Sequence, residues 1–393
     1  MPVTSSLINF INQFEPMVQS ELNSRRGKRK SALHLPEVNI GESLECTSIQ
    51  RMLRQKKGAS FTHSQQDAVE FLCLLLNECH DEQVECIKVT SSNEMAAPAL
   101  INGVDDAKWH TQAPKEEVCI TRAGDFCHSP VSKIFWGECK SVLKKGSTLT
   151  ANVEPFMTLS LDIVGDEIHS VSDALKRYFG KGDLDDYKTK DVSEPVSREV
   201  FLEKLPEVLI LQLNRFAYNN NGLQKIFKHI DVPITLEISK TLVTHNTRKK
   251  MAAANGLGYK LVSIVSHDGQ DANKGHYVSS VYHAGSNCWL QFDDACVKPI
   301  SANQLQKQDG QRQPYVLLYR RDDTFQDLHV PTNAYGIHKE LLHRKKAKSP
   351  KPSIKVGPCT NNNKSEKPKK VNEKKDDLPK GTTANVKKNL KRN

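Results

Sequence analysis

The sequence lacks the features that mark several common protein classes. It has no run of about 18 consecutive apolar residues, so it predicts no membrane-spanning helix. The first residues, MPVTSSLINFINQFEP, lack the basic start and the continuous apolar stretch of a secretory signal peptide. The 10 cysteines are scattered without a C-x-x-C pair. This usage argues against a disulfide framework or a four-cysteine zinc site, and it favours a reducing, intracellular compartment, with the cytoplasm as the expected location.

The last part of the chain lacks aromatic residues altogether. From Arg344 to Asn393 there are 17 Lys+Arg and 4 Asp+Glu, a net charge of +13, whereas the whole chain has a net charge of +10. The remainder is therefore mildly acidic. Because this tail cannot bury enough apolar surface to offset its chain entropy, we predict that residues 344–393 are disordered. Two interpretations stay open: a solvated tail, or a segment that binds a polyanion or directs import into the nucleus.

Apolar periodicity predicts helices in the first 87 residues. Residues 4–22 suit a helix with Leu7, Ile8, Ile11 and Phe14 along one face. The clearest helix is SQQDAVEFLCLLLNECHDE, in which Ser64 begins a capping-box-like start with Asp67 three residues later. One apolar stripe follows, made of Ala68, Phe71, Leu72, Leu75, Leu76 and Cys79.

After this helix the pattern changes twice. Residues 88–130 show no period, and we interpret them as a flexible insertion. From residue 131 onward, strand-like segments dominate: Phe156–Ile163, PEVLILQLNRFAY, GYKLVSIVSHDG, HYVSSVYH, CWLQFDD and YVLLYRR. Helices first and strands later predict an α+β fold, with a helical lobe packed on a mainly antiparallel sheet.

A histidine and two acids share one predicted hairpin. If its turn centres near residues 285 and 286, paired residue numbers sum to about 571, and His276 lies diagonally across from Asp293, roughly 7–8 Å away. Such a carboxylate could accept the Nδ1 proton of His276 and leave Nε2 as a general base. Gly275 would let a substrate backbone approach closely. The alternative is an ordinary surface hairpin that carries a histidine and the acids Asp293 and Asp294.

Further motifs give this hairpin a context. The segments SQQDAVEFLCLLL, LPEVLILQLNRFAY, GYKLVSIVSHDG, KGHYVSSVYH, WLQFDDACV and YVLLYRR stand in the order of, and resemble, the motifs of the ubiquitin-specific peptidase family of cysteine deubiquitinases. The resemblance runs from about residue 4 to residue 321. It implies a papain-like fold of thumb, palm and fingers. Residues 1–87 would then be the helical thumb, 131–321 the fingers and palm, and 322–393 a linker and the disordered basic tail.

The resemblance also implies roles for particular residues. The family removes ubiquitin from proteins by thiol-dependent cleavage, so ubiquitin and ubiquitinated proteins are the implied partners. His276 corresponds to the general base and Asp293 to the acid that orients it, with Asp294 as a neighbour that could share this role. Gln66 and Asp67 are candidates to hold the arginine-bearing tail of ubiquitin, although Asp67 could also serve only as a helix cap. The resemblance implies no cofactor.

Two departures from the family pattern matter. Many members bind zinc in the fingers through two C-x-x-C pairs, whereas Cys139 stands alone here, so we predict no structural zinc. The family's nucleophile lies in a box of the form Gly-x-x-Cys-Tyr-x-Asn at a helix start, where the thiol pKa is lowered and an Asn-type donor stabilises the oxyanion. No such box occurs in the 393 residues. Other cysteines could replace this nucleophile only outside such a box, and none has both the glycine and the asparagine at their positions around the family's cysteine. These are Cys46, Cys73, Cys79, Cys288 and Cys296.

Three hypotheses follow from the absent box. The sequence could be a shortened form of an active deubiquitinase, since the base and the orienting acid are both present. It could instead be a pseudoenzyme that binds ubiquitin or another partner without cleaving. Or it could be a binding protein whose basic tail engages a polyanion. For the 393 residues themselves we predict no isopeptidase activity, because without a thiolate there is no acyl-enzyme route.

Overall fold

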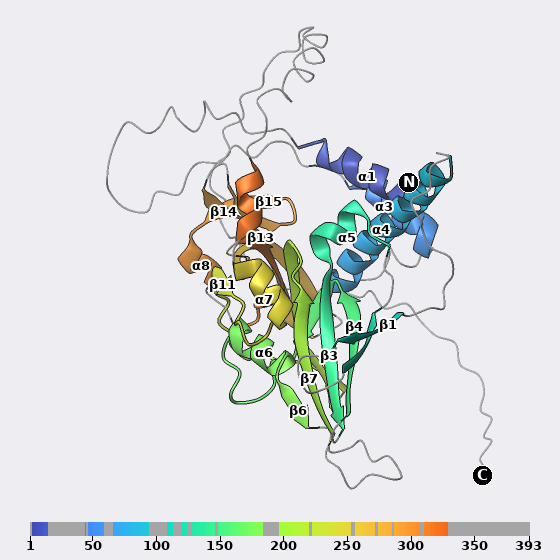
Figure 1. Ribbon diagram of the computed structural model, residues 1–393. Coiled ribbons are helices and arrows are strands. Elements are labelled where there is room, and N and C mark those ends of the chain that lie inside the picture. The colour runs from blue at the N-terminus through green and yellow to red at the C-terminus, as the bar shows by residue number, and fades with distance from the viewer. Residues whose placement is uncertain are drawn as a thin grey trace, which may run out of the picture. The chain divides into compact units, whose positions relative to one another are not determined.

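The computed structural model describes residues 2–14, 44, 46–58, 66–93, 108–112, 119–123, 127–145, 148–183, 196–219, 222–252, 256–271, 274–284, 287–306 and 310–328 (Figure 1). The basic tail from Arg344 to Asn393 lies outside these ranges, and so does Ser64. Disorder and polyanion binding in the tail therefore stay predictions. In the part of the chain that is described, no helix is long and apolar enough to cross a membrane.

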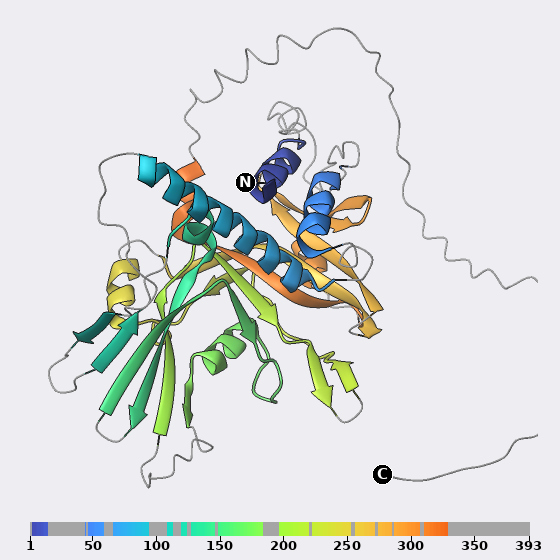
Figure 2. The same cartoon turned by 90° about the vertical axis from the view of Figure 1, so that its right-hand side faces the viewer.

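Helices come first along the chain and pack together. The first three described are α1 (Pro2–Ile11), α3 (Thr47–Lys57) and α4 (Ala68–Asn93), which lie side by side in Figure 2. The short helix α5 (Pro130–Phe135) contacts α4 and begins with a capping box at Ser129. The buried residues of this lobe are Val3, Ile49, Met52, Leu53, Leu75 and Cys79. A helical lobe was predicted for this region, and α4 confirms the apolar stripe that contains Leu75 and Cys79.

The predicted buried face of the first helix is wrong. Val3 is fully buried, and Leu7 and Phe10 pack against the lobe, whereas Ile8, Ile11 and Phe14 are each more than half exposed. The segment carries apolar residues on more than one side, so its periodicity admits two stripes. Contacts with α3 and α4 decide between them, and those contacts are not visible in the local sequence.

A buried carboxylate on α4 caps α1. Glu82 Oε1 accepts a hydrogen bond from the backbone N–H of Val3 at 2.9 Å, and Oε2 accepts from the N–H and the hydroxyl of Thr4, each at 3.0 Å. Burial of Glu82 opposes its ionisation, but these hydrogen bonds prevail and lower the pKa of Glu82 below its ordinary value. The first turn of α1 is thus satisfied by a side chain from another helix.

Glu82→Gln is expected to lower the free energy of unfolding by about 1 kcal/mol at neutral pH, because one charged acceptor is lost. A carboxyl whose pKa is depressed by folding stabilises fully above its unfolded pKa, and that stabilisation is lost as pH falls through its folded pKa. The difference between wild type and variant should therefore shrink below about pH 4.5. Urea unfolding at several pH values measures it. Glu85→Gln, on the exposed side of α4, is the control, and equal losses in both variants would contradict the capping role.

A six-stranded sheet follows the helical lobe (Figure 1). Its strands, in spatial order, are β1 (Lys108–Gln112), β2 (Cys119–Ala123), β4 (Thr148–Phe156), β3 (Gly137–Lys145), β7 (Val196–Lys204) and β6 (Lys181–Asp183). All neighbours are antiparallel except β2 and β4, which are parallel.

Residues 88–130, which we interpreted as a flexible insertion, contain regular structure in their described part. Helix α4 continues to Asn93, and β1 and β2 fall within the range. The strands depend on pairing between β2 and β4, which begins at Cys119 opposite Leu149. A strand whose partner is distant in sequence need not show strong local alternation, which explains why the segment was missed.

The second large sheet has eight strands. Seven follow in spatial order: β15 (Cys296–Ile300), β14 (Cys288–Asp293), β13 (Lys274–His283), β12 (Gly258–Asp271), β16 (Gln313–Arg321), β8 (Val208–Leu213) and β5 (Thr158–Leu161). The eighth, β11 (Thr235–Glu237), pairs with β12. A separate hairpin is formed by β9 (Phe216–Asn219) and β10 (Gly222–Lys225).

Strand β8 is central to the larger core. Leu209, Ile210, Leu211 and Leu213 are almost completely buried, as predicted for a continuous apolar strand. The other short helices in the described residues are α6 (Val171–Tyr178), α7 (His245–Ala252), α8 (Ala302–Gln306) and the 3₁₀ helix η2 (Asp322–Leu328). The predicted α+β class is confirmed, and the β12–β13–β14 edge of the sheet carries the histidine and acids singled out in the sequence.

Candidate active site

The structure brings His276 and Asp293 into direct contact. Nε2 of His276 lies 2.6 Å from Oδ1 of Asp293. In the pairing of β13 with β14, Ser279 lies opposite Phe292 and Tyr282 opposite Trp289. These pairs follow the register predicted from the turn. Both side chains are partly exposed, 43% for His276 and 37% for Asp293, so the pair lies at the rim of the sheet and is accessible from solvent.

The predicted nitrogen is wrong. From the sequence, Nδ1 of His276 was expected to donate to the carboxylate, whereas Nε2 occupies that position. Strand register fixes where the imidazole lies, but rotation of the ring about its own axis decides which nitrogen meets Asp293. Nε2–H therefore donates to Asp293, and no described residue hydrogen-bonds to Nδ1. Nδ1 is the nitrogen that the arrangement leaves for a proton from a thiol or a leaving group.

Asp294 has a different environment. It lies in the turn between β14 and β15, is exposed, and has a positive φ of 50°. Such a φ is unusual for a residue other than glycine, although aspartate tolerates it. Among the described residues, no hydrogen bond joins Asp294 to His276, so the orienting contact is made by Asp293 alone.

Two residues missed in the sequence complete this edge. Arg312 donates from Nε to Asp268 Oδ2 at 3.1 Å, and its Nη2 lies 3.0 Å from the same oxygen. Nη2 also lies 3.9 Å from Oδ2 of Asp293. Asp268 is the direct cross-strand partner of His276. The local sequence does not reveal the role of Arg312. This residue immediately precedes β16, which pairs with β12, so only a correct pairing of those two strands would have placed it beside Asp268.

Asp67 is a helix cap with a second set of partners. Its Oδ1 accepts from the N–H groups of Val69 and Glu70 at 2.8 and 3.1 Å, so Asp67 itself caps α4, which begins at Ala68. The predicted start at Ser64 is thus three residues too early. Oδ2 accepts from the hydroxyls of Tyr315 and Tyr277 at 2.6 and 3.4 Å.

These contacts change what Asp67 can offer a ligand. Both carboxylate oxygens already have partners, and the tyrosine pair connects the start of α4 to β13 and β16. Gln66 precedes Asp67 and is half-buried. Its side chain and that of Asp67 remain candidates for contact with a bound peptide, and their binding role stays a prediction.

Gly275 is required by a neighbour inside the protein. A Cβ on Gly275 would lie 2.1 Å from Nε2 of His267 and 2.7 Å from the carbonyl oxygen of Asp268. His267 is 1% exposed and makes edge-to-face contacts with Phe216 and Tyr277. From the sequence, Gly275 was expected to allow close approach of a substrate backbone. The structure supplies a further reason, which is the fit of β13 against the His267 ring.

None of the described cysteines hydrogen-bonds to His276. Cys73 Sγ lies 3.5 Å from the hydroxyl of Thr158, and Cys79 is buried, which raises the pKa of its thiol. Cys288 is also buried. Cys296 is exposed and lies directly opposite Asp293 in the β14–β15 pairing, on the carboxylate side of the histidine.

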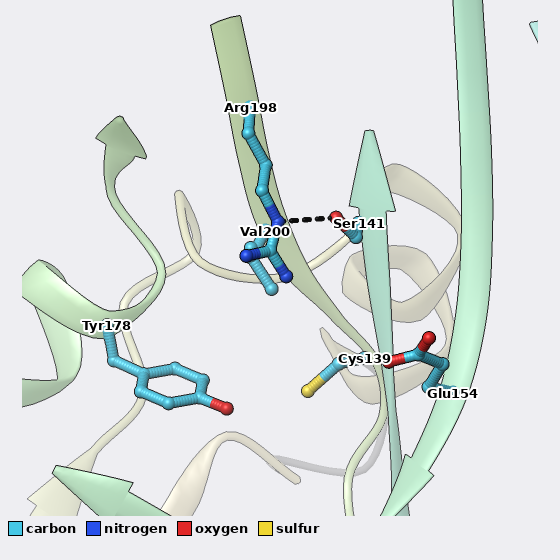
Figure 3. A pocket seen from close by; sticks show the side chains of 6 residues that line it. All are labelled: Cys139, Ser141, Glu154, Tyr178, Arg198 and Val200. Carbon is cyan, nitrogen blue, oxygen red and sulfur yellow. Dashed lines mark hydrogen bonds between the residues drawn. The ribbon is translucent and has the colours of Figure 1, made fainter. Parts of the chain in front are cut away.

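Cys139 lines a pocket in the other sheet (Figure 3). Tyr178, Arg198 and Glu154 share this pocket, and Arg198 Nε donates to Ser141 at 2.9 Å. Burial raises the pKa of Cys139 to about 12, so its thiol is protonated at neutral pH. Within the described ranges, no group of three or more His, Cys, Asp or Glu side chains is arranged to hold a metal ion.

Comparisons with known proteins place this geometry in a family. Residues 5–319 match the family model described as "Ubiquitin carboxyl-terminal hydrolase". Ubiquitin carboxyl-terminal hydrolase 10-B of Xenopus laevis is 33% identical over 342 residues, and hydrolase 10 of Rattus norvegicus is 34% identical over 343 residues. These matches agree with the resemblance of PVSKIFWGECKSVL, EPFMTLSLDI and IDVPITLEISK to ubiquitin-specific peptidase 10.

A solved structure supports the fold. A chain of a SAGA DUB module containing Ubp8, Sgf11, Sus1 and Sgf73 and bound to monoubiquitin superimposes with a TM-score of 0.50 at 23% identity. The match covers 70% of this chain and 52% of that one. The matches to the two curated relatives each cover 82% of this chain but only 42% of the relative, so the chain spans less than half of their length. The chain belongs to the ubiquitin carboxyl-terminal hydrolase family and has the fold of its catalytic domains.

Proposed function

We propose that the chain binds ubiquitin through its peptidase domain, with the C-terminal tail of ubiquitin directed to the rim around His276. The observation that carries this proposal is the 2.6 Å contact between Nε2 of His276 and Asp293, which leaves Nδ1 open at the sheet edge. A base held by a carboxylate is the arrangement that a thiol peptidase requires. The match to a DUB module bound to monoubiquitin supports ubiquitin as the ligand.

The same proposal holds that the 393 residues bind ubiquitin without cleaving it. Among the described cysteines, Cys73 contacts Thr158, Cys79 is buried in the helical lobe, and Cys296 lies opposite Asp293 rather than at Nδ1 of His276. A histidine and a carboxylate without a thiolate have no acyl-enzyme route. A longer form that carries the family's cysteine box would be an active cysteine-type deubiquitinase, and His276 with Asp293 would be its base and orienting acid.

Two measurements on the purified 393-residue chain test this proposal. Calorimetry should show binding of ubiquitin, weakened about tenfold when the last residues of ubiquitin are removed, because the loss of a few tail hydrogen bonds is worth at least this factor. An electrophilic ubiquitin probe should form no covalent adduct. Absence of binding would contradict the ubiquitin proposal, whereas an adduct would show that a cysteine of this chain acts as the nucleophile.

Two further predictions concern the basic tail, which lies outside the described residues, and the location of the protein in the cell. We propose that residues 344–393 could contact a polyanion, supported only by their net charge of +13. Cysteine usage supports a cytoplasmic location, and the basic tail keeps the nucleus as an alternative.

A further inference from the structure

A buried ammonium group lies beneath the His276 rim. Lys225, at the end of β10, is only 7% exposed. Its Nζ donates to the carbonyl oxygens of His267, Gly269 and Gln311 at 2.9, 2.7 and 2.8 Å. Burial lowers the pKa of Lys225 to about 8, with Asp268 opposing the shift. The group therefore stays protonated at neutral pH, and its three N–H bonds match three acceptors.

The three carbonyl groups that accept from Lys225 all belong to residues next in sequence to Asp268 or Arg312. Two of them, on His267 and Gly269, flank Asp268, and the third belongs to the residue before Arg312. Lys225 thus fixes the two backbone segments that present Asp268 and Arg312 to each other. Those side chains form an ion pair with two contacts of 3.0 and 3.1 Å.

This ion pair reaches the candidate base and its acid. Asp268 is the cross-strand partner of His276, and Nη2 of Arg312 lies 3.9 Å from Oδ2 of Asp293. The carboxylate of Asp293 therefore presents Oδ2 to the guanidinium and Oδ1 to the imidazole. A rotation of Asp293 that breaks the contact with Arg312 also changes the contact with His276.

The orientation of Asp293 needs the contact with Arg312 because Asp293 and His276 are both partly exposed to solvent. Asp293 is the last residue of β14, and the turn that follows contains the positive φ of Asp294. Partly exposed ion pairs contribute little by themselves, since water competes for both partners. A network that shares one cation between two carboxylates and fixes the backbone below restricts these rotations more than an isolated pair.

We propose that Lys225 and Arg312 are positioning residues that hold Asp293 in the orientation in which it accepts the Nε2 proton of His276. Neither residue touches the scissile bond in this scheme. Arg312 acts on the carboxylate, and Lys225 acts on the backbone that presents Arg312 and Asp268. The inference rests on the assignment of His276 as the base.

The tautomer of His276 reports directly on this positioning. The full 393-residue chain would be labelled with ¹⁵N-histidine, and the two ring nitrogens of His276 identified by comparison with His276→Gln. Wild type should show the Nε2–H tautomer as the dominant neutral form. In Arg312→Gln and Lys225→Met, the ratio of Nε2–H to Nδ1–H should fall about tenfold, as expected for the loss of a charge-assisted hydrogen bond.

Two further variants make the result specific. Lys298→Gln removes an exposed positive charge from the neighbouring strand β15 and should leave the tautomer ratio unchanged. Arg312→Lys keeps a positive charge at this position, so its ratio of Nε2–H to Nδ1–H tautomer should stay close to that of the wild type. If Lys225→Met fails to fold, Arg312→Gln decides alone, since Arg312 is a rim residue whose side chain is 30% exposed. An unchanged ratio in folded Arg312→Gln would overturn the proposal. The measurement contains no ubiquitin, so a failure of ubiquitin binding cannot produce this result.

Discussion

Arg215→Met is expected to lower the free energy of unfolding by about 3 kcal/mol, a larger loss than is expected for Glu82→Gln or Gly275→Ala. Arg215 is fully buried between β8 and β9. Its Nε donates to the carbonyl of Pro314 at 3.0 Å, and Nη1 donates to the carbonyls of Ile226 and Lys228. Methionine keeps the apolar stem but removes the donor from these three carbonyl groups, of which that of Pro314 is buried and those of Ile226 and Lys228 are partly buried.

The loss of stability in Arg215→Met is reduced by one favourable effect of the substitution. Burial lowers the pKa of Arg215 to about 10, which shows that the charge is held at a cost, and the variant removes that cost. We nevertheless expect the loss of the donor to these carbonyl groups to dominate, because a buried acceptor that is left unpaired costs about 1–3 kcal/mol. Urea unfolding of the full chain measures the change. Arg177→Met, on the exposed side of α6, should cost less than about 1 kcal/mol, and a similar loss for both variants would refute the role of Arg215.

Gly275→Ala is expected to cost about 2 kcal/mol and to disturb the imidazole of His276. The new methyl group would lie 2.1 Å from Nε2 of His267, whose ring cannot withdraw because Phe216 and Tyr277 contact it from two sides. Strand β13 must therefore shift, and His276 is the next residue on that strand. Thermal unfolding measures the loss, and the ¹⁵N signals of His276 measure the displacement.

Gly310→Ala is a matched control for this change. A Cβ on Gly310 would meet no atom within 4 Å, and its φ lies outside the positive range. The control should be neutral or slightly stabilising, since alanine restricts the unfolded chain. If Gly275→Ala were as stable as Gly310→Ala, the close approach of His267 would not be the reason why position 275 requires a glycine.

Local patterns were sufficient for the hairpin that carries the site. The turn that the sequence predicts near residues 285 and 286 gives the register observed for β13 and β14, and alternation along HYVSSVYH gives the face. The proximity of His276 and Asp293 therefore follows from a short sequence. The choice of ring nitrogen does not follow, because it depends on a side-chain rotation. The dual role of Asp67 was visible only in part: its position predicts a cap, but its bonds to Tyr277 and Tyr315 join residues more than 200 positions apart.

The parts that sequence could not predict depend on distant partners. The capping of α1 by Glu82 joins residues 79 positions apart, and the three carbonyl acceptors of Lys225 lie 42 to 86 residues away. Strand β2 pairs with β4, and β1 pairs in turn with β2, so these strands depend on partners that their own composition does not reveal. In each case the physical requirement, a satisfied donor or acceptor, is general, while the residue that meets it is decided by topology.

The central claim is that the rim around His276 receives the C-terminal end of ubiquitin. Photo-crosslinking tests it most directly, with a photoreactive group placed at the last residue of ubiquitin and mass spectrometry of the cross-linked peptides from the 393-residue chain. The account predicts cross-links to β13 near Gly275 and His276 and to the start of α4 near Gln66 and Asp67, both abolished by excess unmodified ubiquitin. Cross-links confined to other surfaces, such as the strands of the six-stranded sheet, would contradict it.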